Sequence, residues 1–533
     1  MMGQLFFVTR LLPAVGMALA LGLANALCAR AALHLLQLES YQLPGYFRAL
    51  RRVGARVWLP GAALACLQAA LAWLWARQTA WMWGMCAATV LCGLLLYMAQ
   101  RRAPAKKPLV FTHRAKRLCA VLWAVQALLA LLPSMAFGLF APYVPWAAAL
   151  CALLAPLVLA LAAWLAQPME ARINRRFFRD AQRRLAARPG LIRIGITGSY
   201  GKTSTKFLLQ TLLSEKYETL ATPASFNTPM GVTRVIREQL KPTHQVFIAE
   251  MGARHVGDIR EMCELVRPVV GILTSVGPQH LETFGTLARV AATKYELIEA
   301  LPPDGTAFFA RDGGICEQLY AKCPVPKRLA GASLAVEDLR VGPQGSAFTL
   351  VDGAGRRVAC ETRLLGQHNI DNLLLCCEVA LHLGLGPDEL ARGIAKLQPV
   401  EHRLQLLATG NGVTVIDDAF NSNPAGAKAA LAVLAAFPPR RIVVTPGMVE
   451  LGEQQDELNR AFGRQMAAAA DIAILVGRRQ TEPIAQGLLD AGFAPENLHC
   501  VATLDESTAL LGSLVHAGDT VLYENDLPDN YAQ

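Results

Sequence analysis

A glycine-rich loop followed by lysine and threonine is the feature of this sequence that most directly suggests chemistry. Residues 198–204 read Gly-Ser-Tyr-Gly-Lys-Thr-Ser; they follow the apolar run Leu191–Thr197 and precede a helical pattern that continues to Leu213. Glycines let backbone N–H groups converge on phosphate oxygens, and the N-terminus of a helix adds a favourable dipole. Lys202 would then bind the β- and γ-phosphates, and the Thr203 hydroxyl would bind Mg²⁺. The pattern predicts a nucleoside triphosphate site, with a simple turn before a helix as the alternative.

The loop departs at one position from the most common phosphate-binding pattern. That pattern, G-x-x-x-x-G-K-[ST], has glycine where this chain has Ile196, so the loop follows the narrower form T-G-S-x-G-K-T-[ST]. The backbone and side-chain groups of this narrower loop would still surround the phosphate oxygens. The residues predicted to bind the phosphates are Gly198, Ser199, Gly201, Lys202, Thr203 and Ser204.

A glutamate, a histidine and a lysine follow further runs of strand or helix type. Glu250 comes directly after the apolar run Val246–Ala249. His280 follows the run Val269–Val276, and Lys294 lies in a helical pattern. Because ligand sites in open α/β sheets lie at the C-terminal ends of the strands, Glu250 is expected near the phosphate loop, where a carboxylate can complete the coordination of Mg²⁺. A surface glutamate, an ordinary polar histidine and a solvated lysine are the alternatives.

The elements that position these residues alternate between strands and helices through the second part of the chain. Such alternation predicts an α/β fold with largely parallel sheets. A further strand pattern, Val413–Ile416, leads into the acidic pair Asp417-Asp418, and the alternation then continues. We therefore expect a central P-loop domain followed by a Rossmann-like C-terminal domain, with residues 306–365 forming short strands and turns.

The first part of the chain has a very different composition. Residues 1–190 contain 21 lysines and arginines but three aspartates and glutamates, whereas residues 191–533 contain 30 basic and 38 acidic residues. The basic part is also the more hydrophobic one, which is typical of a membrane region. Because no nucleic-acid-binding signature accompanies the basic charge, nucleic acid is not expected as a partner. The overall hydrophobic content of 53% excludes disorder.

Five apolar stretches in this first part reach about 20 residues, the length needed to cross a bilayer. Basic residues cluster between the first and second, between the third and fourth, and after the fifth. The positive-inside rule therefore predicts a multi-pass plasma-membrane protein with its N-terminus outside and its catalytic domains in the cytoplasm. The spans would either anchor the chain or bind substrate. The predicted transmembrane helices are Leu11–Cys28, Val57–Trp75, Thr79–Met98, Leu118–Leu139 and Trp146–Ala166.

These patterns divide the chain into four segments. Residues 1–167 form the helical transmembrane region, 168–190 a basic juxtamembrane linker, 191–400 the central phosphate-binding domain and 401–533 the C-terminal domain. Within the linker, Arg172–Arg184 is typical of an amphipathic helix that contacts anionic membrane lipids. The 13 cysteines show no metal-binding spacing and are expected to be reduced.

Several motifs resemble, in the same order, those of the Mur ligase family, the ATP-dependent amide ligases of bacterial cell-wall synthesis. Besides the phosphate loop, they include Ala249–Ala253, Gly366–Asn372 and Asp417–Pro424. The resemblance covers about residues 190–530 and implies that the chain binds ATP and forms an amide bond. It does not extend to the family's N-terminal domain, which holds a UDP-sugar and which the predicted membrane region replaces here.

The resemblance also implies catalytic and metal-binding roles for particular residues. Thr203, Glu250 and His280 are expected to bind Mg²⁺, of which the family uses two ions. Lys294 is expected to react with CO₂ to form a carbamate, an anion that can bridge Mg²⁺ and orient the γ-phosphate. Lys202, Glu250, His280 and Lys294 are thus the expected catalytic residues.

Other matching positions are expected to contact the nucleotide and the substrate. Asn369 and Asn372 would approach the adenine, because an amide both donates and accepts hydrogen bonds. Arg403 and Asp418 would contact the nucleotide from the C-terminal domain. The expected substrate contacts are Asn227, Thr228 and Asn421.

The chain departs from the family pattern at three places in its C-terminal part. His402 stands where the family has glycine, and Gly447 stands where it has aspartate. The segment Tyr523–Tyr531 replaces a K-G-S-R type segment, so the resemblance leaves open whether the donor is a dipeptide.

Together these features predict a ligase that adds an amino acid or a dipeptide to a peptidoglycan or other cell-envelope precursor. The reaction would pass through an acyl phosphate and release ADP and phosphate. Because predicted spans replace the UDP-sugar domain, a lipid-linked precursor is one candidate acceptor, and the identity of the acceptor stays open. A membrane-bound synthase of a poly-amino acid such as polyglutamate is one alternative, and an ATP-binding membrane scaffold without turnover is another.

Overall fold

The structure is a computed structural model that describes most of the chain. The described residues are 11–75, 82–102, 108–136, 143–224, 226–279, 281–342, 344–409, 412–420, 422–449 and 451–526. They form two compact units, of which the first ends at Asn174 and the second extends from Arg175 to the end of the described chain.

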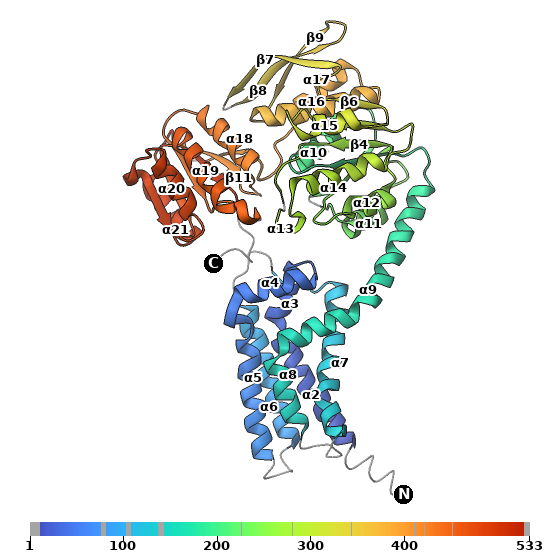
Figure 1. Cartoon of the computed structure of the whole chain (residues 1–533), viewed down its shortest axis with the longest axis vertical. Coiled ribbons are helices and arrows are strands. Elements are labelled where there is room, and N and C mark those ends of the chain that lie inside the picture. The colour runs from blue at the N-terminus through green and yellow to red at the C-terminus, as the bar shows by residue number, and fades with distance from the viewer. Residues whose placement is uncertain are drawn as a thin grey trace. The chain divides into compact units, whose positions relative to one another are not determined.

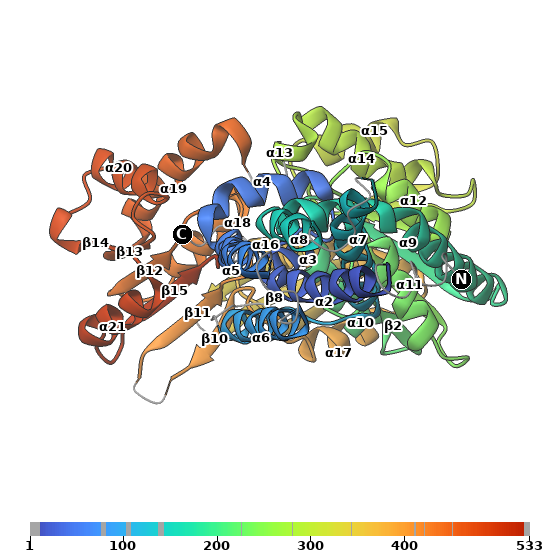
Figure 2. The ribbon, with the colours of Figure 1, turned by 90° about the horizontal axis from the view of Figure 1, so that it is seen from below.

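The N-terminal unit is built from helices throughout its described residues. Helices α2, α5, α6, α7 and α8 run side by side (Figures 1 and 2). Two of them, Met82–Arg101 and His113–Pro133, are long and apolar enough to cross a membrane, and the number rises to five if each of three bent helix pairs counts as one span. The helices are α2 Leu12–Cys28, α3 Arg30–Leu38, α4 Leu43–Val53, the 3₁₀ turn η2 Gly54–Val57, α5 Leu59–Trp75, α6 Met82–Arg101, α7 His113–Ala136, α8 Val144–Leu153 and α9 Ala155–Ala186.

The predicted fifth span, Trp146–Ala166, is not one continuous helix. The structure bends the chain by 89° between α8 and α9, with Leu154 at the break. Pro156 explains the bend, because proline has no N–H to donate to the preceding turn and disfavours a helical conformation at the residue before it. The ten residues of α8 rise about 15 Å, half of the roughly 30 Å of a hydrocarbon core. Helix α9 then continues to Ala186, so the predicted basic linker is helical over most of its length.

The central domain is built on a six-stranded parallel sheet with the order β2-β3-β1-β4-β5-β6. Successive residues of a strand face opposite sides, so each strand contributes to two cores. In β1, for example, Ile194 and Ile196 pack against three helices, α10 (Lys202–Leu213), α16 (Gln367–His382) and α17 (Pro387–Ala395). The opposite face of the sheet packs against α11, α12, α14 and the end of α9. The strands are β1 Ile192–Thr197, β2 Thr219–Ala221, β3 Val246–Glu250, β4 Val270–Leu273, β5 Thr306–Phe309 and β6 Lys327–Leu329.

Most helices of this domain begin after a strand, whereas α14 and α17 each follow another helix. A separate antiparallel sheet of β7 Leu334–Gly342, β8 Gly345–Asp352 and β9 Arg357–Thr362 accounts for the predicted short strands between 306 and 365. Helix α15 in the same stretch was not predicted. The helices are α10 Lys202–Leu213, α11 Pro229–Glu238, α12 Asp258–Val266, α13 Leu281–Phe284, α14 Leu287–Glu299, α15 Ile315–Lys322, α16 Gln367–His382 and α17 Pro387–Ala395.

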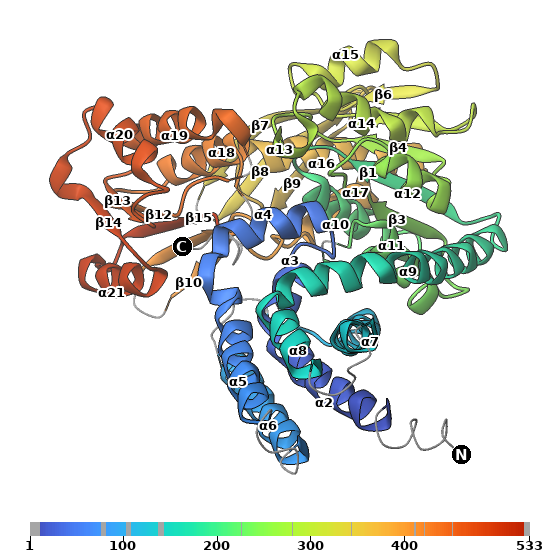
Figure 3. The ribbon, with the colours of Figure 1, turned by 60° about the horizontal axis from the view of Figure 1, so that its bottom comes forward.

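The C-terminal domain has a second six-stranded sheet with the order β10-β11-β15-β12-β13-β14. All neighbouring strands are parallel except the edge pair β10 and β11. Helices α18, α19 and α20 cover one face and α21 the other (Figure 3). The strands are β10 Gln405–Ala408, β11 Thr414–Asp418, β12 Arg441–Thr445, β13 Ile472–Val476, β14 Leu498–Val501 and β15 Thr520–Glu524; the helices are α18 Pro424–Ala435, α19 Gln455–Ala469, α20 Glu482–Asp490 and α21 Leu504–Leu514.

Candidate active site

The phosphate loop joins β1 to α10, as predicted. Gly198 and Gly201 have φ values of 151° and 79°, which L-residues with side chains rarely adopt. A Cβ at Gly198 would lie 1.9 Å from Thr274 Oγ1, so only glycine fits there. The Ser199 hydroxyl donates to the Gly277 carbonyl at 2.9 Å, which ties the loop to the segment after β4.

Lys202 is folded over this loop. Its Nζ donates to the carbonyls of Gly198 at 2.7 Å and Ser199 at 3.0 Å. Burial lowers the pKa of Lys202 to about 8; Glu250 opposes this shift, and Arg403 adds to it. A cation held at the mouth of a glycine loop by backbone carbonyls is suited to bind a phosphate oxygen.

Glu250 lies at the centre of the site, at the end of β3 and 1% exposed. Its Oε1 accepts hydrogen bonds from Thr203 Oγ1 and Asn227 Nδ2, both at 3.1 Å. Its Oε2 lies 3.0 Å from Lys206 Nζ. Burial opposes ionisation of Glu250, but the charges of Lys206 and Lys202 outweigh it and lower the pKa of this carboxyl. The alternative of a surface glutamate is therefore wrong.

Lys206 is a site residue that the sequence analysis missed. It lies four residues after Lys202 on α10, hence on the same helix face, and its side chain is fully buried. Its Nζ also donates to the Ala224 carbonyl. Burial lowers the pKa of Lys206 whereas Glu250 raises it. We take the pair as ionised, because the two groups are in direct contact and Thr203 and Asn227 also stabilise the charged carboxylate.

Replacing Lys206 with methionine is expected to destabilise the protein by about 3–5 kcal/mol, because it leaves Glu250 buried without its cation. Urea unfolding of the full chain in mild detergent, followed by circular dichroism, measures the change. Lys216→Met at an exposed lysine is the matched control, expected to cost less than about 0.5 kcal/mol. Adding Glu250→Gln to Lys206→Met should restore part of the lost stability, because the buried carboxylate is then replaced by a neutral amide. Equal stability of the two lysine variants would contradict the role of the pair.

Lys294 is buried within α14 rather than solvated, being 2% exposed. Burial and the charge of Lys202 lower the pKa of Lys294 to about 7, while Asp258 and Glu296 oppose the shift. Glu296 is itself engaged, since it accepts the backbone N–H groups of Gly257 and Arg260. An appreciable share of Lys294 is therefore a neutral amine near neutral pH, the form that reacts with CO₂.

The structure shows the surroundings of two of the predicted substrate contacts, Thr228 and Asn227, whose substrate roles stay predictions. Thr228 is the N-cap of α11 and accepts the Gly231 N–H at 3.2 Å, which gives it a structural role. Asn227 faces Glu250, as described above. His280 and Asn421 lie outside the described residues, so their roles remain predictions.

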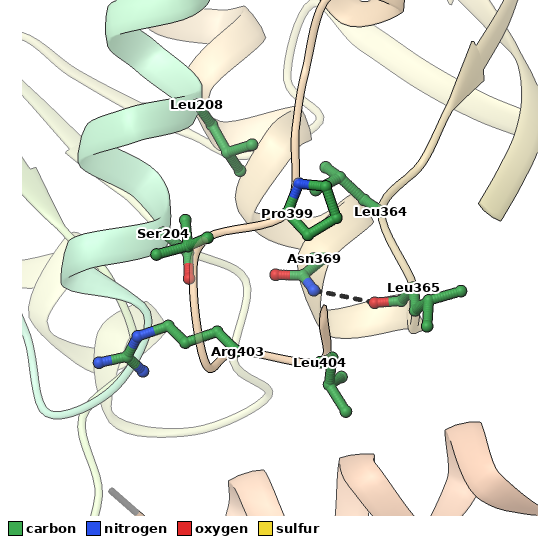
Figure 4. Close-up of a pocket in the computed structure, with 9 residues that line it drawn as sticks. Ser204, Leu208, Leu364, Leu365, Asn369, Pro399, Arg403 and Leu404 are labelled. Carbon is green, nitrogen blue, oxygen red and sulfur yellow. Dashed lines mark hydrogen bonds between the residues drawn. The ribbon is translucent and has the colours of Figure 1, made fainter. Parts of the chain in front are cut away.

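A pocket beside α10 brings together two of the residues predicted to bind nucleotide. Asn369 is buried and donates to the Leu365 carbonyl at 2.8 Å, and Arg403 extends from the same pocket toward α10 (Figure 4). A Cβ at Gly201 would lie 2.9 Å from Asn372 Oδ1, so Asn372 lies against the phosphate loop. The pocket is lined by Ser204, Leu208, Leu364, Leu365, Asn369, Pro399, Val400, Arg403 and Leu404.

Arg403 is available for an anionic ligand. Its guanidinium lies over the Phe420 ring, 4.5 Å from the centroid, and its buried Nε has no hydrogen-bond partner among the described residues. Burial lowers the pKa of Arg403, although Asp418 and Glu250 oppose this effect. An unpartnered guanidinium N–H beside a phosphate loop fits a role in binding the nucleotide phosphates.

Asp418, which was predicted to contact the nucleotide, lies beside a second carboxyl group in the structure. It is the register partner of Glu524 in the parallel pair β11 and β15, and its Oδ1 accepts the Leu404 N–H at 3.1 Å. Burial raises the pKa of Asp418, and burial together with Asp418 raises the pKa of Glu524 well above its usual range. Glu524, which accepts from the Ser422 hydroxyl, is a second residue that the sequence analysis missed.

The residues present fit Mg²⁺ bound together with a nucleotide. Among the described residues no three His, Cys, Asp or Glu side chains form a metal-binding group. Mg²⁺, however, commonly takes one or two protein ligands in addition to phosphate oxygens and water. The Thr203 hydroxyl and the Glu250 carboxylate, already in contact at the end of the phosphate loop, form such a pair.

Comparisons with known proteins identify the family of both α/β domains. Residues 196–380 match the model of the Mur ligase middle domain, and residues 402–523 match that of the Mur ligase glutamate ligase domain. UDP-N-acetylmuramoyl-tripeptide--D-alanyl-D-alanine ligase from Mycobacterium bovis (strain ATCC BAA-935 / AF2122/97) is 33% identical over 362 residues, covering 62% of this chain and 70% of the relative. This confirms the resemblance derived from the motifs.

Solved structures show the same fold. MurF from Acinetobacter baumannii aligns with a TM-score of 0.61 and 24% identity over 67% of this chain and 78% of its own. MurF from Thermotoga maritima in complex with ADP aligns with a TM-score of 0.59 and 23% identity over 66% and 80%. Both family models lie in the second unit and follow the order of the two α/β domains. The chain therefore belongs to the Mur ligase family, whose members are ATP-dependent ligases that form C–N bonds.

Proposed function

We propose that this protein is a membrane-embedded ligase that joins an amino acid or dipeptide to a carboxylate of a peptidoglycan precursor. The observation that supports the reaction best is the contact of Thr203 and Lys206 with Glu250 beside the Lys202 loop. The relative from Mycobacterium bovis is named for a UDP-N-acetylmuramoyl-tripeptide and for D-alanyl-D-alanine. For this chain we propose an acceptor of the same class, a muramoyl peptide. D-alanyl-D-alanine is the first donor to test.

In the first step the acceptor carboxylate attacks the γ-phosphorus of ATP, forming an acyl phosphate and releasing ADP. Lys202 would stabilise the charge on the transferred phosphoryl group, and Arg403 would contact the phosphates from the other domain. Thr203 and Glu250 would hold Mg²⁺, which supplies positive charge to the phosphate oxygens. Lys206 keeps Glu250 ionised and in place.

In the second step the amine attacks the acyl carbon, and the tetrahedral intermediate expels inorganic phosphate as the amide forms. The attacking nitrogen loses a proton on the way. The acyl phosphate must be kept from water, and we propose that the C-terminal domain, which provides Arg403 and Asp418, closes over it.

We further propose that Lys294 is carbamylated. Its neutral amine adds to CO₂, forming an N–C bond and releasing one proton, so that a cation becomes an anion. Burial and the nearby charge of Lys202 support this, because both disfavour an ammonium and the second favours a negative group. With His280, the carbamate would hold a second Mg²⁺.

The N-terminal unit is the basis for proposing a lipid-linked acceptor. The first of the two family matches begins at residue 196, and a helical unit with two to five candidate membrane spans precedes it. We propose that the chain crosses the plasma membrane five times, with bent helix pairs counted as single spans. The N-terminus would be outside and the ligase domains cytoplasmic.

The test uses the full chain in nanodiscs, supplied with ATP, Mg²⁺ and D-alanyl-D-alanine. The UDP-linked and the lipid-linked muramoyl tripeptide are compared as acceptors, and mass spectrometry detects addition of the dipeptide. We expect the lipid-linked form to gain the dipeptide mass and Lys202→Ala to give no product. Exclusive use of the UDP-linked form would refute the lipid-linked acceptor.

Two further outcomes of the same experiment address the alternative functions. A ladder of products that differ by one amino-acid mass would identify a poly-amino-acid synthase. ADP release at the same background rate with and without Lys202 would indicate a scaffold that does not turn over.

A further inference from the structure

A basic pocket lies between the end of α9 and the central sheet, away from the phosphate loop. Its volume is about 560 Å³, which is in the range of small-ligand sites. All of its lining residues belong to the second unit. They are Arg179, Gln182, Arg183, Leu185, Ala186, Arg193, Leu265 and Arg267.

The end of α9 is held firmly against the central domain, so this pocket is part of the fold. Ala181 and Leu185 are buried in the core that α9 shares with α11 and α12. On one side of the helix Asp180 pairs with Arg237 at 2.8 Å. On the other, Gln182 Nε2 donates to the Glu264 carbonyl at 2.9 Å. Three faces of the helix are thus attached to the domain.

The four arginines of the pocket come from three separate elements. Arg179 and Arg183 lie one helical turn apart on the same face of α9 as Gln182. Arg193 is the second residue of β1, and Arg267 follows directly after α12. The fold therefore brings together four cations that the sequence separates by up to 88 residues.

No carboxylate neutralises this cluster. None of the four arginines forms an ion pair within the described part of the chain, and no acidic side chain lines the pocket. Asp180, the carboxylate nearest in sequence, is paired with Arg184 and Arg237 instead. The buried Nε of Arg193 has no hydrogen-bond partner there, and burial and the charge of Arg267 lower the pKa of Arg193. Uncompensated cations held this closely favour an anionic ligand.

The position of the pocket excludes a direct part in the ligation. Arg193 is at the N-terminal end of β1, whereas the phosphate loop begins at Gly198 beyond the other end. At about 3.3 Å per residue the two sites are separated by roughly 17 Å of strand. A ligand in the pocket would bind the domain without reaching the reacting atoms.

We propose that this pocket binds the phosphate of an anionic lipid headgroup and so docks the ligase domain onto the membrane surface. Guanidinium groups bind phosphate through paired N–H donors, and four of them surround the space. Ala186 is exposed at one side of the pocket, where the glycerol of the lipid would lie, and the largely buried Leu185 and Leu265 form the wall behind it. The helix that provides two of the arginines is continuous with the helical N-terminal unit, which favours a lipid over a soluble phosphate compound as the source.

Native mass spectrometry of the full chain in detergent tests the proposal, with phosphatidylglycerol or phosphatidylcholine added in increasing amounts. The double variant Arg193→Gln/Arg267→Gln removes two pocket arginines that are not on α9. We expect it to lower the affinity for the first phosphatidylglycerol at least about tenfold. The matched control Arg175→Gln/Arg176→Gln removes the same charge from exposed positions of α9 outside the pocket, within the basic helix Arg172–Arg184 that was predicted to contact anionic lipids in general. If the pocket binds the first headgroup, the affinity of this control should change less than about twofold.

Three results would overturn the proposal. Equal losses in the two double variants would show general attraction to a basic helix, and equal binding of the two lipids would show no headgroup recognition. Displacement of the lipid by soluble glycerol phosphate at similar concentrations would assign the pocket to a soluble phosphate compound. If the glutamine variant does not fold, Arg193→Lys/Arg267→Lys replaces it; this variant keeps the charge but loses the paired donors, and we expect a loss of at least about threefold.

Discussion

ATP turnover is expected to fall about a thousandfold when Lys202 is replaced by alanine. The side chain is the cation at the mouth of the phosphate loop, and its ammonium group lies within 3.0 Å of two loop carbonyls. Its proposed role is to neutralise charge that develops on the γ-phosphoryl group, an effect that is largest in the transition state. The loss should therefore appear mainly in kcat.

A coupled assay of ADP release in the presence of acceptor and amine measures this effect. Lys396→Ala is the matched control, because the Lys396 side chain is exposed and lies outside the candidate site. It should leave turnover within about twofold, since its partner Glu215 keeps a second cation, Arg392. If Lys202→Ala retains more than about a tenth of the activity, the loop does not act in phosphoryl transfer.

Replacing Lys294 with alanine is expected to lower activity at least about a hundredfold and to abolish its dependence on CO₂. In the proposed mechanism the carbamate provides the negative charge that holds the second metal ion. The wild-type enzyme should lose activity in CO₂-depleted buffer and recover it when bicarbonate is added. Because the pKa of Lys294 is lowered to about 7, the reactive neutral amine should decrease as the pH falls below 7.

The measurement follows initial rates in degassed buffer with and without bicarbonate, at pH 6 and pH 8. Bicarbonate should stimulate the wild-type enzyme and have no effect on the alanine variant. The extra mass of the carbamate is lost on acidification, so ¹³C NMR with labelled bicarbonate is the direct readout. A wild-type enzyme that is equally active in CO₂-depleted buffer would contradict carbamylation, whatever the activity of the variant.

The phosphate loop could be predicted from the sequence because its determinants are local. Two glycines with positive φ, a lysine and a threonine lie within seven residues, between a short apolar strand and a helix that begins at Lys202. Glu250 was predicted for a similar reason, since it ends a strand that is buried along its whole length. Each pattern is complete within about ten residues.

The partners of these residues could not be predicted in the same way. Lys206 and Glu250 are 44 residues apart, and the contact exists because α10 follows β1 and packs beside β3. Asp418 and Glu524 are brought together by the register of β11 and β15. Neither separation leaves a periodic signal in the chain. The bend before α9, in contrast, has a local cause in Pro156. The prediction missed it because the apolar run is long enough for one continuous span.

The sequence by itself determined the alternation of strands and helices, the phosphate loop and the family, because hydrophobic period and turn residues act over short distances. Only the tertiary structure decided that Lys294 is buried, that Glu250 has a cation of its own, and that four arginines share one pocket. Burial and ion pairing depend on which elements pack against each other. That packing is set by the whole sheet rather than by the residues next to each group in the chain.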